Sequence, residues 1–96
     1  MIRYAVEITP QAEQEIADAV LWYASKNKVV AETFRAIVFD SIELISNSPL
    51  SWAAVSARGV RRFVLPRYPY TVFFHVIGST VKIIAVTHHH RKPKIW

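Results

Sequence analysis

The spacing of apolar residues changes from a helical to a strand-like pattern between residues 47 and 60 of this 96-residue chain, and that change constrains the fold more than any other feature. From about residue 10 to residue 47, apolar side chains recur every three or four positions, as on one face of a helix. From residue 60 to residue 86 they form three short runs rich in β-branched and aromatic residues, which is typical of strands. A chain of this length has room for one hydrophobic core, so we expect a single domain over residues 1–96.

Two helices are predicted in the first half. Thr9-Pro10 supplies a side-chain cap and a proline suited to the first helical position, which predicts a helix from about 10 to 26. Its apolar stripe faces the core, and three polar residues are expected to face water: Gln11, Glu15 and Asp18. After the polar break Lys26-Asn27-Lys28, a second apolar repeat runs from Val30 to Asn47-Ser48-Pro49. The two segments together predict a helical hairpin.

Four strands are predicted around that hairpin. The alternating residues over about 2–8 predict a short strand, residues 50–58 are expected to form a loop anchored by Trp52, and three strand-like runs follow: Val60–Leu65, Tyr70–Ile77 and Val81–Val86. Gly78-Ser79 separates the last two closely enough for an antiparallel hairpin. The order β-α-α-β-β-β predicts a two-layer α+β domain, in which the helical hairpin packs on a mainly antiparallel four-stranded sheet.

The middle strand indicates how that sheet is oriented. Val72, Phe74 and Val76 share one face, and Thr71, Phe73 and His75 share the other. We therefore expect the sheet to bury one face against the helices and to show the other to solvent.

Charge is divided unevenly along the chain. All seven Asp and Glu residues lie in residues 1–57, whereas residues 58–96 hold eight of the twelve Lys and Arg residues and all four His. A folded segment without a carboxylate attracts nucleic acid, an acidic protein or an acidic peptide, and charge alone does not choose among them.

Several chemistries and locations are excluded or not expected. The chain has no Cys, so a disulfide, a thiol nucleophile and a Cys-based metal site are excluded. The sequence shows neither a signal peptide nor an apolar run long enough to span a membrane, so we expect a cytoplasmic protein with no membrane partner. No cofactor is expected.

Short motifs, taken in order over nearly the whole chain, resemble the RelE/ParE superfamily of type II toxin–antitoxin toxins, and in particular its ParE-like, plasmid-stabilisation branch. The motifs that carry the resemblance are Pro10-x-Ala12, Trp22-Tyr23, Asn47-Ser48-Pro49, Gly59-Val60-Arg61-Arg62, Pro69-Tyr70, Ile84-Ala85-Val86-Thr87-His88 and Arg91-Lys92-Pro93-Lys94-Ile95-Trp96. The resemblance implies the RelE/ParE fold and a small toxin that a cognate antitoxin holds inactive in a hetero-oligomer. The antitoxin's C-terminal segment would wrap the toxin, and the basic half of this chain suits such an acidic segment.

The superfamily divides by target, and two classes of function follow. ParE-type members act on DNA gyrase and are not known to catalyse a reaction, whereas RelE-type members cleave mRNA on the ribosome. Candidates for the RNase chemistry exist: His88, His89 and His90 as acid or base, Arg61, Arg62 and Arg91 as phosphate ligands, and Tyr70 to stack on a base. Thr71, however, stands where RelE-type members carry an Arg, which favours the gyrase-directed function. A relative that binds an antitoxin without being toxic is a third possibility.

The residues expected to contact the target or the antitoxin are Arg61, Arg62, Tyr70, His88 and Arg91. On a regular strand Arg61 and Arg62 point to opposite faces, so one is expected to reach a partner and the other to pair with a helix carboxylate such as Glu43. No metal site is expected, because at most His88 and His90 could meet one ion. Four aromatic residues are expected to serve packing: Trp22, Tyr23, Trp52 and Trp96.

Overall fold

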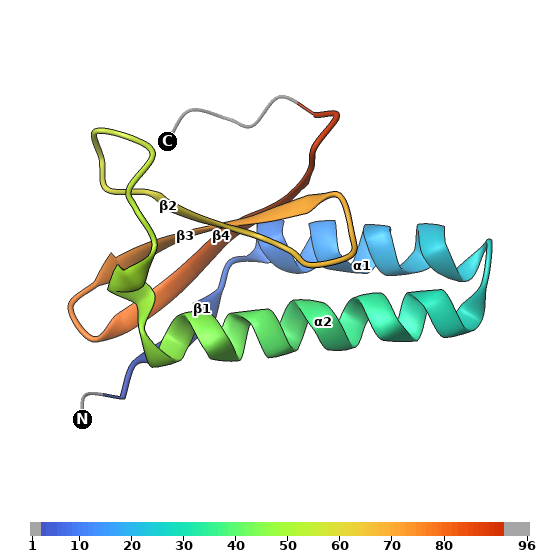
Figure 1. The fold of residues 1–96 in the computed structure, drawn as a ribbon, viewed down its shortest axis with the longest axis horizontal. Coiled ribbons are helices and arrows are strands. Elements are labelled where there is room, and N and C mark those ends of the chain that lie inside the picture. Colours follow the sequence, from blue (N-terminus) through green and yellow to red (C-terminus); the bar gives the residue numbers. More distant parts are fainter. Residues whose placement is uncertain (1–2, 92–96) are drawn as a thin grey trace.

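Two helices cover one face of a four-stranded sheet (Figure 1). The computed structural model describes residues 3–91. Its elements in chain order are β1 (Ala5–Ile8), α1 (Pro10–Ala24), α2 (Lys28–Asn47), the short 3-10 helix η1 (Pro49–Ser51), β2 (Arg61–Val64), β3 (Tyr70–Ile77) and β4 (Thr80–His88). The predicted α+β class and the order β-α-α-β-β-β are confirmed. Within the described part of the chain, neither helix is long and apolar enough to cross a membrane.

Side-chain caps fix where both helices begin. The Thr9 hydroxyl accepts a hydrogen bond of 3.1 Å from the Ala12 amide at the start of α1. The Asn27 side chain accepts from the amides of Val29 and Val30 at the start of α2. Each cap satisfies amide groups that have no partner inside the helix. Helix α1 ends at Ala24, two residues earlier than expected.

The sheet has the order β1-β4-β3-β2, which places the last strand of the chain in its interior. Strand β3 runs antiparallel to both β2 and β4, and β1 pairs with β4 in parallel. The N-terminal segment is thus the fourth strand, as predicted. The pairing of β1 covers only Thr80–Ile83 of β4. Among residues 3–91, no strand therefore flanks the second half of β4 on the edge opposite to β3.

The main core lies between the helices and the facing side of the sheet. Phe34, Val38 and Ile45 of α2 are completely buried, and so are Val72 and Phe74 of β3. This confirms that Val72 and Phe74 share the buried face. Non-polar burial of this kind is the main force that holds the two layers together.

The outer face of the sheet is less open than expected. Thr71 and Phe73 are each only 8 % exposed, and Phe73 packs in a second cluster with Val60 and Ala85. Because β4 carries an extra residue where its register with β3 shifts between Phe73 and Phe74, Ala85 still reaches the outer face while Ile83 faces the helices. The expectation that the sheet shows this face to solvent is therefore wrong at the centre of the face.

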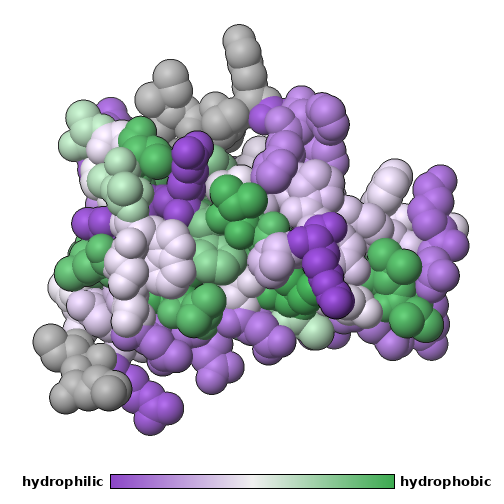
Figure 2. Space-filling model, in the orientation of Figure 1, coloured by the Kyte–Doolittle hydropathy of each residue, from purple (hydrophilic) through white to green (hydrophobic). Residues whose placement is uncertain are grey.

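The segment between η1 and β2 is anchored as expected. The Trp52 ring packs against Phe63 of β2, with ring centroids 5.2 Å apart. Ala54 also forms an isolated bridge with Arg61, so the predicted loop is held at the edge of the sheet. Exposed apolar side chains elsewhere are scattered, and Figure 2 shows them on this face as separate areas rather than one continuous patch.

Candidate functional site

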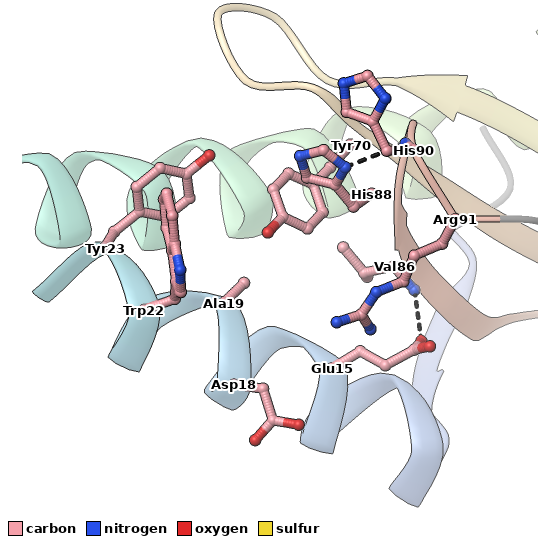
Figure 3. Close-up of a pocket in the computed structure, with 10 residues that line it drawn as sticks. All are labelled: Glu15, Asp18, Ala19, Trp22, Tyr23, Tyr70, Val86, His88, His90 and Arg91. Carbon is pink, nitrogen blue, oxygen red and sulfur yellow. Dashed lines mark hydrogen bonds between the residues drawn. The ribbon is translucent and has the colours of Figure 1, made fainter. Parts of the chain in front are cut away.

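A concave surface lies between α1 and the second half of β4, and we call it the α1–β4 groove (Figure 3). Its volume is about 650 Å³. The residues that line it are Glu15, Asp18, Ala19, Trp22, Tyr23, Tyr70, Val86, His88, His90 and Arg91. Three of the five predicted binding residues, Tyr70, His88 and Arg91, therefore lie in one groove.

The short length of β1 leaves this region of β4 open toward α1. Where β1 no longer pairs, helix side chains take its place: Glu15 Oε1 accepts a hydrogen bond of 2.9 Å from the Val86 amide. The Thr9 hydroxyl donates to the Ile84 carbonyl oxygen over 3.4 Å. Glu15 is half-buried, so the expectation that it faces water is wrong. Helical spacing alone does not reveal its role, because that role depends on where β1 ends.

Tyr70 and two histidines form the β-strand side of the groove. The Tyr70 ring meets His88 edge-on at 5.0 Å, and its other contacts include the core residue Phe34 at 5.0 Å. His88 and His90 stack with ring centroids 5.1 Å apart, and His88 Nδ1 accepts a 3.0 Å hydrogen bond from the His90 amide. This pair closes the end of β4, as a strand cap.

The environment sets the protonation of these rings. Burial lowers the pKa of His88, and the neighbouring His90, His89 and Arg91 lower it further, so the imidazole is neutral near neutral pH. Because Nδ1 accepts a hydrogen bond, the proton of the neutral ring belongs on Nε2. Burial raises the pKa of Tyr70 against the opposing effect of Arg91, which keeps the phenol protonated and able to donate.

Opposite charges face each other across the groove. Glu15 and Asp18 lie on α1, and the Arg91 guanidinium extends from the turn after β4 into the space between the helix and Tyr70 (Figure 3). The Arg91 amide donates to the His88 carbonyl oxygen over 3.0 Å, which closes that turn. At the far end of the groove Trp22 is 58 % exposed, so the expectation that it serves core packing is wrong. Tyr23 does pack against the core, as expected.

The other predicted residues lie on different surfaces. Arg61 faces the helix layer opposite Phe74, and its Nη1 donates to the Trp52 carbonyl oxygen, so the expected pairing of an arginine with Glu43 is wrong. Arg62 is exposed on the outer face. There it lines a smaller hollow of about 170 Å³, the outer hollow, together with Thr71, Phe73, Thr87, His88, His89 and Arg91.

His89 turns away from the groove. Its ring Nε2 lies 3.1 Å from the Thr71 hydroxyl, and its amide donates to the Pro69 carbonyl oxygen over 2.8 Å. The three consecutive histidines are thus divided between two surfaces. Within residues 3–91, no three His, Asp or Glu side chains gather as metal ligands.

The fold defines a class of small α+β proteins, with two helices on one face of a four-stranded sheet, that is also found in a solved structure. A solved structure described as the chromosomal ParDE TA system from P. aeruginosa has the same fold, with a TM-score of 0.81 and 16 % sequence identity; the match covers 92 % of this chain and 98 % of that one. The protein-family model described as "ParE toxin of type II toxin-antitoxin system, parDE" matches residues 6–93 of this chain. This chain therefore belongs to the ParE toxin family.

The family match confirms the ParE-like resemblance found in the sequence. A search of the curated proteins finds no match. The last part of the C-terminal motif, Lys92 to Trp96, lies outside the described residues, as does the expected packing of Trp96.

Proposed function

We propose that this ParE-family chain is the toxin of a toxin–antitoxin pair, that it acts in the cytoplasm by binding DNA gyrase or another replication component, and that a cognate antitoxin neutralises it. Family membership supports the general function. The observation that carries the choice of a non-catalytic mechanism is the shortage of cations: Arg61 is bound to the Trp52 carbonyl oxygen, and Thr71 stands where the RNases carry an arginine.

Ribonuclease chemistry requires a base, an acid and fixed cations within reach of one phosphate. Arg61 is bound to the Trp52 carbonyl on the helix side, and Arg62 stands on the outer face. The Thr71 hydroxyl interacts with His89, at the position where the RNases carry an arginine. Arg61 is therefore held by the scaffold, and Arg62 meets His88, His89 and Arg91 only in the outer hollow, which neither Tyr70 nor His90 lines.

The contact surface for the target or the antitoxin comprises Tyr70, His88 and Arg91 in the groove and Arg62 on the outer face. Arg61 serves the scaffold, because its guanidinium holds the Trp52 loop. The cations suit an acidic segment that folds on binding, and the open half of β4 suits an extended one. Such a segment would hold toxin and antitoxin together as a hetero-oligomer.

One observation favours a second candidate, a ribosome-dependent mRNA endonuclease. Tyr70, His88 and Arg91 line one groove, and they supply a phenol, an imidazole and a cation close together. The two candidates make opposite predictions in cells.

The test is induction of the chain in a bacterial host while DNA integrity and translation are followed in parallel, with the antitoxin supplied or withheld. Early DNA damage and filamentation, together with inhibition of gyrase supercoiling by the purified protein, are expected. Rapid translation arrest with mRNA cleavage would replace the proposal by the second candidate. Antitoxin binding without growth arrest would indicate a non-toxic relative.

A double variant tests the contact surface. His88→Ala with Arg91→Ala is expected to weaken growth inhibition or antitoxin binding, whereas Arg35→Ala, on the exposed side of α2, is the matched control. If the double variant is stably folded and leaves both properties intact, the surface is assigned wrongly.

A further inference from the structure

Donor groups without partners converge at the β4 end of the α1–β4 groove. Within residues 3–91, the Arg91 guanidinium and the Tyr70 hydroxyl have no hydrogen-bond or ion-pair partner. Figure 3 shows the Tyr70 hydroxyl and the Arg91 guanidinium pointing into the same open space. An arginine and a protonated phenol together suit an anion with several oxygen atoms, such as a phosphate.

Acceptor groups lie along the α1 side of the same groove. One oxygen of Glu15 accepts from the Val86 amide, and one oxygen of Asp18 accepts from the Gln14 side chain over 2.8 Å. Each carboxylate keeps a second oxygen that can accept. Ligand hydroxyl groups are suitable donors for these two positions, whereas a further anion would be repelled by them.

The third part of the groove is aromatic. Trp22 lies about 10 Å from Glu15 along the axis of α1, at 1.5 Å per residue. Its ring meets Tyr23 edge-on at 5.1 Å, and Lys26 Nζ lies 5.6 Å from its centroid. An indole that is 58 % exposed beside a groove offers a stacking surface for a planar ring.

From this order of groups we infer that the α1–β4 groove binds a nucleotide, with the phosphate at Arg91 and Tyr70, the ribose hydroxyls at Glu15 and Asp18, and the base against Trp22. A volume of about 650 Å³ lies within the usual range for ligand sites. An acidic peptide such as the proposed antitoxin segment can meet the same cations, but its carboxylates supply no donors for Glu15 and Asp18, whereas the hydroxyls of a ribose do. The inference goes beyond the proposed function, because it assigns a ligand to the groove whether or not the chain acts on gyrase.

The test is isothermal titration calorimetry of the purified 96-residue chain, in separate titrations with AMP, adenosine and inorganic phosphate. AMP is expected to saturate one site. The affinities of adenosine and of phosphate are each expected to be lower than that of AMP by about tenfold or more, because adenosine lacks the phosphate and phosphate lacks the ribose and the base. Equal affinity for AMP and phosphate would reduce the groove to a simple anion site and overturn the inference. The absence of saturable AMP binding would overturn it as well.

Variants locate the ligand. Arg91→Gln is expected to weaken AMP binding by about tenfold or more, since a charge-assisted contact is lost. Trp22→Ala is expected to weaken AMP more than phosphate, because only AMP carries a base. Arg35→Gln removes the same charge from the outside of α2 and is expected to change nothing. An unchanged affinity in Arg91→Gln, or an acidic peptide that depends on Arg91 while AMP does not bind, contradicts the assignment.

A final comparison distinguishes the source of the nucleotide. A short oligonucleotide with a 5′-phosphate is compared with the same oligonucleotide ending in a 5′-hydroxyl and with free AMP. Binding of the phosphorylated oligonucleotide as tight as that of AMP identifies a nucleic-acid end, and binding of AMP alone identifies a free nucleotide; both results support the site. The cellular assays of DNA damage and translation are independent of these titrations, so the two proposals fail separately.

Discussion

At the scale of single residues, Glu15 supplies the hydrogen-bond acceptor that a neighbouring strand would otherwise supply to β4. Its carboxylate accepts from the Val86 amide at the point where β1 has ended. A partly buried amide without an acceptor is costly, so one helix side chain stabilises the free half of an interior strand.

Replacing Glu15 tests this role. Glu15→Ala is expected to lower the free energy of unfolding by about 1–3 kcal/mol, because the Val86 amide loses its partner. Glu15→Gln keeps a carbonyl oxygen at the same place and is expected to lose much less. Urea unfolding monitored by circular dichroism measures both, and equal losses in the two variants would show that the charge of Glu15 matters rather than its hydrogen bond.

His88 links protonation to stability. Its pKa is lowered in the folded protein by burial and by nearby His90, His89 and Arg91, so the unfolded chain binds the proton more readily. This contribution to stability is fully present above the unfolded pKa of about 6.5 and is lost as the pH falls through that value toward the folded pKa.

The matched variant for this prediction is His88→Asn, whose side-chain oxygen can still accept from the His90 amide but does not titrate. The decrease in urea midpoint between neutral and mildly acidic pH is expected to be smaller in His88→Asn than in the natural chain. Identical pH profiles would show that His88 does not contribute.

At the scale of elements, the start of α1 connects the helix layer to the sheet. The Thr9 hydroxyl accepts from the Ala12 amide and also donates to the Ile84 carbonyl of β4. One side chain therefore caps a helix and replaces part of a strand pairing.

Thr9→Ala is expected to cost about 1 kcal/mol of unfolding free energy, the usual effect of losing a helix cap. Thr33→Ala is the control, since the Thr33 hydroxyl donates to the Val29 carbonyl in the middle of α2, where alanine is the better helix former. Thermal unfolding measures both variants. A cost for Thr33→Ala as large as that for Thr9→Ala would argue against a capping role.

The elements differ in how well sequence predicts them. The start of α1 is predictable because Thr9-Pro10 is a local signal, and the middle strand is predictable because its alternation is regular. Strand β4 extends to His88, past the apolar run that predicted its end, because Thr87 and His88 pair with Thr71 and Tyr70. Such pairing is a long-range property, and no local pattern of apolar residues contains it.

In the candidate site, too, some residues are predictable from the sequence and others depend on long-range contacts. The sequence indicates Tyr70, His88 and Arg91 through motif resemblance, and the fold brings these three together. It does not indicate Glu15 or Trp22, whose roles depend on how α1 lies against β4. Arg61 and Arg62 were correctly expected to point to opposite faces, but the Trp52 carbonyl that binds Arg61 is supplied by a loop without a periodic pattern.

At the scale of the whole molecule, one aromatic residue joins the helix layer to the groove. Phe34 is completely buried, and its ring contacts Tyr23, Tyr68 and Tyr70 at about 5 Å. Stability and the shape of the groove therefore depend on the same side chain.

Phe34→Ala is expected to lower the free energy of unfolding by about 3–5 kcal/mol, the typical cost of a large cavity in a core. Phe39→Ala serves as the control, because Phe39 lies on the same helix and is 42 % exposed. Chemical denaturation gives both values. Similar losses in the two variants would contradict the placement of the core between α2 and the sheet.

The sheet order also determines when the protein can fold during its synthesis. Thr9 and Ile84 are 75 positions apart, yet they are hydrogen-bonded, and within residues 3–91 β1 pairs with β4 alone. An N-terminal fragment that stops before β4 lacks Val81, Ile83 and Val86, the completely or almost completely buried residues at the centre of the sheet. The ribosome must therefore translate this chain through β4 before the four-stranded sheet can form, and a message cut short before β4 would yield a fragment without the centre of the sheet.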